Sequence, residues 1–487
     1  MTLQGESSAY SVQATTIREI IAPLLAIIVG MFMVILDGTA MNVALPGLVK
    51  DFHSTLSVVQ WAVTGYALSQ AAVIPLAGWL SDRFGSKKVF LFSVLMFTIG
   101  SGLCALALGI NQLIVFRIIQ GLGGGMVAPI AMAFVYRLSP RAKVGAVMGM
   151  IGIPMLLAPA LGPVLSGWLV EYASWHWIFI INLPVGVLAL LTGIRTLPNF
   201  TRKSVPVLDV LGMVLAPLAF ASLVYGVNEG SSSWTSARTM IGLIFGGILL
   251  VLFVITELRR RQPLLELRVF RSADFSRGIV VQWVTQIALF GTMFLLPLFL
   301  QQGKGFTPFE SGLSVLPQAI AAAVFMPIGG RLFDRFGARP VVITGLIFVT
   351  SATYLLSGIS ASDGSQALIL PLALLGAGMG LSMMPLNTHI IQAAPEDIVS
   401  RVTSLTNAFQ QVMMSFAVAG LSTILSSRMK LHLKDGFQPL HALSTSFGET
   451  FSVLMGIAIV GMVLSLMLRK PKNKEDGTGS AKVAAEH

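Results

Sequence analysis

The sequence predicts an all-α integral membrane protein with fourteen transmembrane helices, arranged as two pseudo-symmetric six-helix bundles plus two extra central helices. The first observation behind this prediction is composition: of 487 residues, 55% are hydrophobic and 11% are charged, and the mean hydropathy is +0.82. Soluble globular proteins carry about 25% charged residues, so a soluble enzyme, a disordered chain and a disulfide scaffold are excluded. The single cysteine, Cys104, also excludes an internal disulfide and a cysteine-based metal site.

The second observation is the number of long apolar stretches. A helix needs about 20 mostly apolar residues to cross the hydrocarbon core of a bilayer. Fourteen stretches meet this length, at residues 21–45, 57–80, 88–108, 112–136, 144–170, 177–195, 208–227, 239–257, 278–301, 311–331, 341–359, 366–391, 402–426 and 448–468. None of the polar connections between them is long enough to form a soluble domain.

The distribution of basic residues orients these spans. With a cytoplasmic N-terminus, 25 of the 32 Lys and Arg residues fall in inside loops and tails, six fall outside, and Arg117 lies within a span. Such an excess of basic residues on one side is the positive-inside pattern. An even number of spans then places both termini in the cytoplasm. The net charge of +11 therefore needs no nucleic-acid partner.

The third observation is an internal repeat. Residues 78–87 (GWLSDRFGSK) and 330–339 (GRLFDRFGAR) are identical at six of ten positions, and each leads from an apolar span into a predicted inside loop. Related halves around a central path are typical of transporters. We therefore predict a cytoplasmic segment, a six-helix bundle, two linking helices with a cytoplasmic loop, a second six-helix bundle and a cytoplasmic tail, at residues 1–20, 21–200, 201–274, 275–468 and 469–487.

In its span arrangement and its repeat, the sequence resembles the major facilitator superfamily, specifically its fourteen-span drug:proton antiporter branch. The resemblance extends over nearly the whole chain. The two repeats match the superfamily's signature loop. Motifs of the first, fourth and sixth helices of the branch are matched by residues 36–46 (LDGTAMNVALP), 117–121 (RIIQG) and 175–184 (WHWIFIINLP). In the last of these motifs His176 stands where the branch usually has arginine.

The fifth predicted span resembles the antiporter motif Gly-x8-Gly-x3-Gly-Pro-x2-Gly-Gly. The matching residues are Gly149, Gly162, Pro163 and Gly167, and the other two positions hold the small residues Ala158 and Ser166. Small residues allow close helix packing and proline can bend a helix, which suits halves that rock against each other; ordinary membrane packing is the alternative. The glycines between residues 121 and 125 are interpreted as close packing, because neither a preceding strand nor a following Lys-Ser/Thr pair marks a phosphate loop.

Two charges lie within the predicted spans. Of the 21 acidic residues only Asp37 lies well inside one, and Arg117 is its basic counterpart. A charge at bilayer depth costs at least about 2.5 kcal/mol and usually marks an ion or substrate path. Burial disfavours a charged carboxylate, so Asp37 suits proton binding and release in competition with a cationic substrate, and the resemblance implies that Arg117 takes part in proton coupling or the central hydrogen-bond network. Alternatively, Asp37 caps a helix break near Gly38 or is permanently paired, and Arg117 only ties its helix to neighbours.

The repeated loops are candidates for a conformational latch, because the resemblance implies that the first loop holds the two halves together in the outward-open state. The predicted latch residues are Gly78, Asp82, Arg83, Gly85 and Lys87 in the first half, with Asp334, Arg335 and Gly337 in the second. Alternatively the basic residues only orient the spans, although this does not explain the repeated aspartate.

Polar and amphipathic residues within the spans are candidates for the wall of a substrate cavity. They are Asn42, Trp61, Tyr66, Gln70, Gln282, Gln286, Asn387, Asn407 and Gln411. For each residue, helix packing or interfacial anchoring is the alternative. The thirteenth span has no acidic residue, which favours neutral, zwitterionic or monovalent substrates. No two histidines have metal-ligand spacing, and His389 is a candidate proton partner.

Together these observations predict a proton-coupled multidrug efflux transporter that exports amphipathic or cationic compounds by alternating access. It is expected to be no enzyme, to use a proton gradient without a cofactor or metal, and to function as a monomer in the bacterial cytoplasmic membrane. The alternative within transport is a dedicated exporter of one metabolite, antibiotic or lipid-like compound. A membrane enzyme is disfavoured because no nucleophile with a base and no metal cluster is found at matching depth, and the repeat disfavours a receptor or channel.

Overall fold

The computed structural model describes residues 17–138, 158, 161–200, 209–230, 233–260, 263, 265–360, 363–393 and 399–468, and all regular structure within them is helical. The first helices are α1 (Ile17–Asp51), α2 (Leu56–Val59), α3 (Trp61–Val73), α4 (Leu76–Phe84), α5 (Ser86–Ala105), α6 (Ile110–Leu138), a helical segment at residues 161–172, α8 (His176–Ile180) and α9 (Asn182–Thr196). They are followed by α10 (Val210–Glu229), α11 (Ala237–Arg259), η2 (Leu267–Arg271), α12 (Ala273–Leu298), η3 (Phe299–Gly303), α13 (Pro308–Ser314), α14 (Leu316–Phe336), α15 (Ala338–Ser357), η4 (Ser365–Leu368), α16 (Ile369–Gln392), α17 (Val399–Lys434) and α18 (Pro439–Ser465).

The described residues form twelve segments long and apolar enough to cross a membrane, and a bent pair makes a thirteenth. In that pair α3 and α4 meet at an angle of 51° next to Pro75, where proline interrupts the helical hydrogen bonds. The predicted span at residues 144–170 lies mostly outside the described residues. The all-helical, multi-pass class is therefore confirmed, whereas the count of fourteen spans is not.

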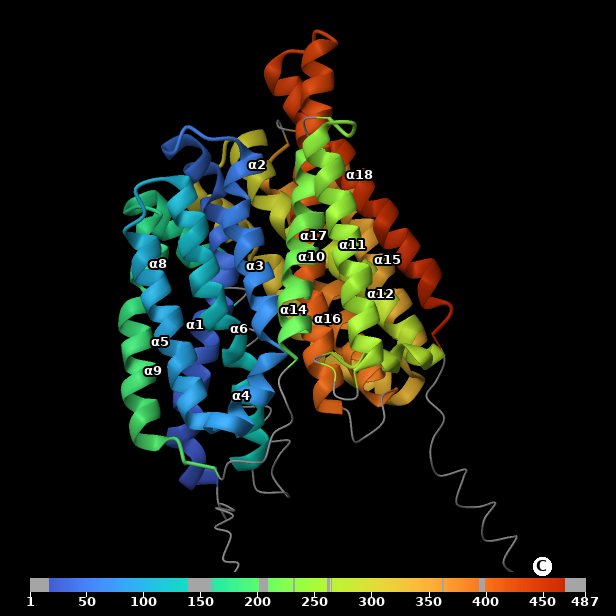
Figure 1. Cartoon of the computed structure of the whole chain (residues 1–487). Helices are drawn as coiled ribbons and strands as arrows, with labels where there is room; N and C mark the ends of the chain where they lie inside the picture. Colours follow the sequence, from blue (N-terminus) through green and yellow to red (C-terminus); the bar gives the residue numbers. More distant parts are fainter. Residues whose placement is uncertain are drawn as a thin grey trace, which may run out of the picture.

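The helices gather into two groups (Figure 1). Helices α1 to α9 lie on one side and α12 to α18 on the other, with α10 and α11 beside the seam between them. The start of α1 and the end of α18 lie toward the same end of the molecule, which we call the inner end, and the α17–α18 connection projects at the opposite, outer end. The domain boundaries stay a prediction.

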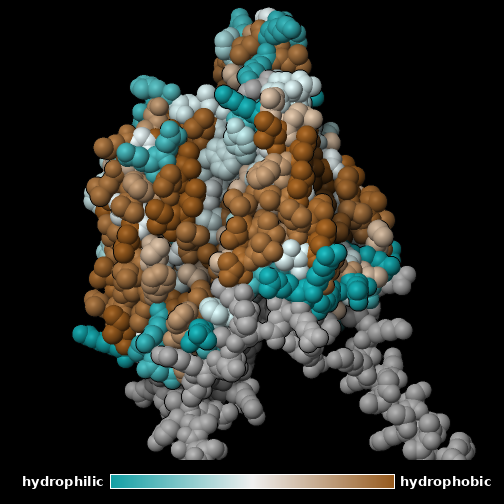
Figure 2. Space-filling model, in the orientation of Figure 1, coloured by the Kyte–Doolittle hydropathy of each residue, from teal (hydrophilic) through white to brown (hydrophobic). Residues whose placement is uncertain are grey.

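Apolar side chains cover the middle of the molecule on the face that Figure 2 shows. The face in view is covered by hydrophobic side chains, with hydrophilic groups concentrated toward both ends. Large apolar side chains exposed by more than half include Phe92 on α5, Leu191 on α9, Val251 on α11 and Val463 on α18. So large an exposed apolar surface marks contact with a membrane.

The two groups of helices are joined at the outer end. One apolar cluster contains Leu45 of α1 together with Phe299 of η3 and Phe447 of α18, and the Gln301 amide donates a hydrogen bond to the Val43 carbonyl at 2.9 Å. Toward the inner end, by contrast, one apolar cluster is built from the first half alone and another from the second half alone. The structure is therefore closed between its halves on the outer side.

Helix α10 covers the seam between the α2–α3 region and α17, and α11 packs on α10. The Asn228 carbonyl accepts a hydrogen bond from the Gln60 side chain, and its amide donates to the Ser57 carbonyl at 3.1 Å. On the other side of α10, the Thr423 hydroxyl of α17 donates to the Val227 carbonyl at 3.1 Å. Of the two linking helices, α10 thus contacts both halves at once.

The glycine-rich stretch of α6 packs as predicted. A Cβ atom on Gly123 would lie 2.5 Å from the Phe97 nitrogen of α5, and one on Gly125 would lie 2.8 Å from the Gln70 Cα of α3. Since these positions admit no side chain, α6 lies directly against α5 and α3 at the centre of the first half.

The α17–α18 connection differs from the sequence prediction. The sequence predicts a polar connection between the spans at residues 402–426 and 448–468, but α17 continues to Lys434 and α18 begins at Pro439. A helical hairpin therefore projects beyond the bundle (Figure 1). Glu449 links its two helices, with its carboxylate 3.5 Å from Arg428 and 3.2 Å from His432. Hydropathy detects only the part of a helix that lipid covers, whereas the Met, Leu and Lys residues beyond it are good helix formers.

Candidate functional site

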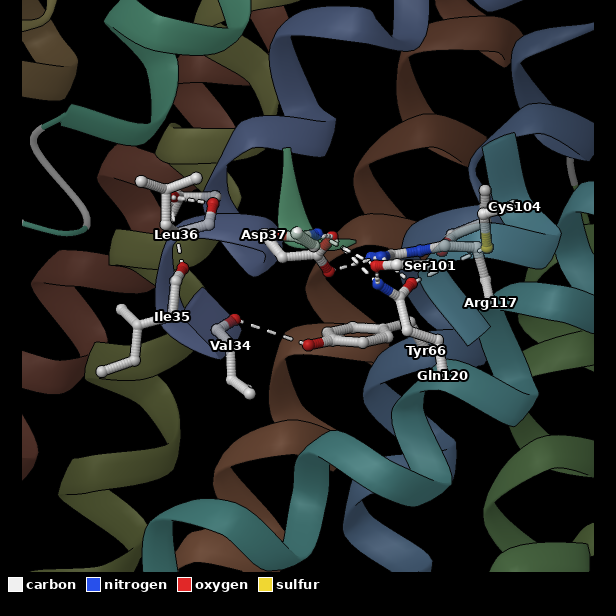
Figure 3. Close-up of polar contacts among 12 residues, drawn as sticks. Val34, Ile35, Leu36, Asp37, Tyr66, Ser101, Cys104, Arg117 and Gln120 are labelled. Atoms are coloured by element: carbon white, nitrogen blue, oxygen red, sulfur yellow. Dashed lines mark hydrogen bonds and ion pairs between the residues drawn. The ribbon is translucent and has the colours of Figure 1, made fainter. Parts of the chain in front are cut away.

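Asp37 on α1 and Arg117 on α6 form a fully buried ion pair. Both residues are 0% exposed, and Nη1 of Arg117 donates to Oδ2 of Asp37 at 2.6 Å (Figure 3). The two charges that the sequence places within spans are thus each other's partners. A buried pair is stable only when hydrogen bonds satisfy its remaining polar atoms.

Neighbouring helices supply those hydrogen bonds. The Gln120 amide donates to Oδ1 of Asp37 at 3.1 Å and to the Ser101 hydroxyl at 2.5 Å, while its carbonyl accepts from Arg117 at 2.7 Å. The Asn182 amide also donates to Oδ1 of Asp37, at 2.9 Å, and to Ser101 at 3.0 Å. Because the Asp37 carboxylate only accepts in these contacts, the network suits its charged form. It connects α1, α5, α6 and α9.

Arg117 is also held by an aromatic ring and a backbone carbonyl. Its Nε atom donates to the Ala62 carbonyl at 3.0 Å, and its Cζ atom lies 3.9 Å from the centre of the Tyr66 ring. The ring lies beside the guanidinium in Figure 3 and attracts it through a cation–π interaction. Nη2 is the one guanidinium nitrogen with no acceptor among the described residues. Tyr66, predicted for the cavity wall, therefore lies in the charged network.

A protonated Asp37 would have a different set of contacts. Adding a proton to a carboxylate oxygen removes the negative charge and turns an acceptor into a donor. Gln120 and Asn182 present amide donors to Oδ1, and Arg117 presents another to Oδ2. Protonation would weaken all three contacts, because it removes the negative charge that these donors face, and it would loosen the network that positions α1 against α6 and α9.

The helical segment 161–172 packs against α1 beside this site. A Cβ atom on Gly162 would lie 3.2 Å from the carbonyl of Leu36 and would collide with the hydroxyl of Thr39. Leu36 and Thr39 flank Asp37 in the sequence, so this segment contacts the turn of α1 that carries Asp37.

The opposite side of the same segment contacts the second half at the outer end. A Cβ atom on Gly167 would collide with the Pro308 carbonyl, and one on Gly312 of α13 would collide with the Pro163 carbonyl. In addition, the backbone nitrogen of Phe309 donates to the Glu171 carboxylate at 3.0 Å. This reciprocal contact brings two backbones together across the seam. Gly149 of the predicted antiporter motif lies outside the described residues.

The repeated loops form the same turn in both halves. Gly85 separates α4 from α5 with φ of 95°, and Gly337 separates α14 from α15 with φ of 81°, a region that glycine adopts readily. Lys87 donates to the Ile194 carbonyl of α9 at 2.7 Å, within its own half. Of the other predicted latch residues, Gly78 lies in α4, Asp82 is half-buried, and Arg83, Asp334 and Arg335 are exposed.

The predicted cavity residues are only partly brought together. Besides Tyr66, the buried ones are Asn42, Gln70, Gln282 and Gln286. Trp61, Asn407 and Gln411 are half-buried, and Asn387 is exposed. Gln282 and Gln286 are one turn apart on the same face of α12. Within the described ranges, no three His, Cys, Asp or Glu residues gather as metal ligands.

Three members of the charged network were not singled out from the sequence: Gln120, Asn182 and Ser101. Gln120 and Asn182 lie in the motifs at residues 117–121 and 175–184, so their place in these motifs could have identified them as candidates. Ser101 lies in an apolar span outside these motifs, and no feature of the sequence points to it.

A helical membrane protein with two halves that close across one end, and with a buried ion pair within one of them, has the architecture of a secondary transporter. The comparison with known families agrees: residues 27–418 match the Major Facilitator Superfamily. The chain belongs to this superfamily.

Relatives with similar sequences are named for drug resistance. The chain is 38% identical to the multidrug resistance protein B homolog of Mycobacterium tuberculosis (strain ATCC 25618 / H37Rv), over 80% of this chain and 73% of the relative. It is 32% identical to the lincomycin resistance protein LmrB of Bacillus subtilis (strain 168), over 93% of this chain and 95% of the relative. The resemblance to the drug:proton antiporter branch is thereby confirmed.

Solved structures share the fold at low sequence identity. An auto-inhibited POT family peptide transporter superposes with a TM-score of 0.68 at 15% identity, covering 93% of this chain and 98% of that one. A D-xylose-proton symporter superposes with a TM-score of 0.66 at 14% identity, covering 93% and 98%. These similarities concern the fold alone.

Proposed function

We propose that this protein is a multidrug efflux transporter that exchanges protons for amphipathic or cationic compounds by alternating access. The observation that carries the proton-coupled part is the buried Asp37–Arg117 pair, whose carboxylate is the one acidic group well inside a span. The names of the relatives support the multidrug part. The protein functions as a monomer in the bacterial cytoplasmic membrane, with both termini in the cytoplasm and no cofactor beyond the proton gradient.

In this proposal Asp37 is the proton carrier. A proton that enters from the outer side binds a carboxylate oxygen of Asp37 and neutralises it, which leaves the Arg117 charge without its counter-ion. A buried charge without a partner is costly, so the protonated state favours a different arrangement of α1 and α6. The closed outer end and the hydrogen bonds that Asp37 accepts correspond to the state after the proton has left to the inner side.

The segment 161–172 links the proton site to the outer contact. It packs on α1 beside Asp37 through Gly162, and on α13 through Gly167. A change at Asp37 therefore alters the position of the segment that closes the outer end. The loops that contain Asp82 and Asp334 hold the two halves together when these close at the inner end. The linking helices keep the seam covered while the two halves rock against each other.

The alternative is a dedicated exporter of one antibiotic or metabolite. A relative named for lincomycin resistance alone, which matches nearly the whole chain, favours it. Both candidates need the same proton site and differ only in the range of substrates. A panel of monovalent cationic, zwitterionic, neutral and divalent cationic compounds separates them, because a multidrug transporter exports several unrelated members of the first three groups.

The test is proton-driven transport in vesicles that contain the purified full-length protein. An imposed pH gradient should drive export of panel compounds by the wild type and not by Asp37→Asn, which cannot exchange a charge. Asp51→Asn is the matched control, since Asp51 ends the same helix at its exposed outer end, and it should retain export. Normal pH-driven export by correctly inserted Asp37→Asn would overturn the proposal.

A further inference from the structure

One face of α12 carries a line of buried polar side chains whose oxygens have no hydrogen-bond partner in the described part of the chain. Gln282, Thr285 and Gln286 lie on one side of the helix, since each residue turns it by about 100°. They are 7%, 2% and 3% exposed. The Gln282 and Gln286 carbonyl oxygens and the Thr285 hydroxyl have no hydrogen-bond partner among the described residues. We call these three residues the α12 polar face.

His389 of α16 lies at the inner end of this face. Gly278, one turn before Gln282, faces the imidazole: a Cβ atom at Gly278 would lie 3.1 Å from Cδ2 and 3.6 Å from Nε2 of His389. The absence of a side chain there makes room for the ring. His389 is 0% exposed, and neither Nδ1 nor Nε2 has a partner in the part of the chain that the structure describes.

Among the described residues, the charged group that acts on His389 belongs to α12. Asp274 in the first turn of α12 acts on the imidazole electrostatically, and Asp274 is paired with Arg277 at 3.3 Å. No other titratable residue occurs in the sequence of α16. Next to His389, Ile390 belongs to an apolar cluster with Val402 and other residues of α11, η2, α12 and α17.

A purely structural role does not explain this arrangement. Buried polar side chains are hydrogen-bonded in the large majority of cases, and a histidine that only fixed helix packing would use at least one ring nitrogen. Ionisable residues at membrane depth usually mark an ion or proton path. A neutral imidazole with a free nitrogen can bind a proton near neutral pH, and the adjoining polar face offers successive sites for a hydrated path.

We propose that His389 is a second proton-binding site of the transport cycle, reached along the α12 polar face. This inference rests on the proposed proton-coupled export. In each cycle one proton adds to the free ring nitrogen of His389 and another to Asp37, and both are released to the inner side. Two protons entering for one exported monovalent cation move one net positive charge inward, so the membrane potential drives export.

The test measures charge movement with ethidium, a monovalent cation, in vesicles that contain the full-length protein. With no pH gradient, a potential of about 100 mV can sustain roughly a 50-fold ethidium gradient when one net charge moves per cycle. The wild type should build such a gradient. His389→Gln should build none, because one proton exchanged for one cation moves no net charge, while an imposed pH gradient should still drive its export. His441→Gln, at an exposed histidine of the outer hairpin, should behave as the wild type.

The outcomes separate this inference from the proposed function. If the wild type fails to respond to a pH gradient, the proposed proton coupling itself is wrong. If it responds to the pH gradient but not to the potential, Asp37 is the one proton carrier and the role of His389 is overturned; this measurement needs no variant. If His389→Gln keeps the full potential-driven gradient, the second proton binds elsewhere and the inference fails.

Discussion

The polar groups around Asp37 and those along α12 are buried to a similar degree, but they differ in their partners. Asp37 and Gln120 belong to a network in which four helices exchange hydrogen bonds, whereas Gln282, Gln286 and His389 have polar atoms without described partners. Apart from Nη2 of Arg117, the polar atoms of the first network are paired, and a paired buried network is rigid. An unpaired one gains free energy when water, a proton or a ligand occupies it. The first half thus contains a paired charged network, and the second half a set of buried polar groups with unpaired atoms among the described residues.

The largest effect should follow from removing one member of the ion pair. Arg117→Leu leaves the Asp37 carboxylate buried without a counter-charge, which should destabilise the fold by about 3–5 kcal/mol and abolish transport. Removing both charges in Asp37→Asn/Arg117→Leu should restore most of that stability but no transport. Thermal unfolding in detergent, together with transport in vesicles, measures the two effects separately.

Arg117→Lys sharpens the same experiment. A lysine keeps the charge but lacks the planar fork that reaches Asp37, Gln120 and the Ala62 carbonyl together. It should recover stability relative to Arg117→Leu and still transport at least about tenfold more slowly than the wild type. Full transport by Arg117→Lys would mean that the charge alone matters and that the network geometry does not.

The next effect concerns the outer contact between the two halves. Gly312→Val would force side-chain atoms into the Pro163 carbonyl, so the segment 161–172 should move away from α13. We expect the outer ends to separate and efflux to fall at least about tenfold, because the outer-closed state is lost. Distances between spin labels on the outer ends of α1 and α13 would report the separation. Gly420→Val is the matched control, since a Cβ atom at Gly420 meets nothing within 4 Å.

Two equivalent Gln→Leu substitutions test the comparison between the Asp37 network and the α12 polar face. Gln120→Leu removes a residue bonded to Asp37, Arg117 and Ser101, and should destabilise the fold by about 1–3 kcal/mol. Gln282→Leu removes a carbonyl oxygen that has no described partner, so it should leave stability equal or slightly higher. Equal losses of stability in both variants would show that the two regions do not differ as described.

A functional residue can be predicted from the sequence when its residue type is rare at that position. Asp37 and Arg117 could be found because charges inside apolar spans are uncommon, and each was correctly placed within a helix. Ser101 could not be found, since a hydroxyl in a membrane helix usually bonds to its own backbone, as Ser93 does. Its role depends on which helices are neighbours, and hydropathy does not determine that.

Helix ends show the same limit. Apolar stretches located the cores of the spans, because lipid requires apolar side chains over about 20 residues. They did not show that α1 begins at Ile17 or that α17 continues to Lys434, since helices outside the lipid tolerate polar residues. The contact of Gly167 with Pro308 could not be predicted either, because the motif indicates close packing but does not identify the partner helix.

The smallest effect should appear where the two halves are alike. Gly85 and Gly337 occupy equivalent turns with φ of 95° and 81°, so Gly85→Ala and Gly337→Ala should each destabilise the fold by about 1 kcal/mol through backbone strain. Gly78→Ala lies inside α4, where a Cβ atom meets nothing within 4 Å, and should be neutral or stabilising because alanine favours helices. Thermal unfolding of the three variants checks this. If the two variants lose clearly different amounts of unfolding free energy, the repeated turns do not contribute equally to stability despite their shared sequence. The first loop would then make stabilising contacts that the second lacks.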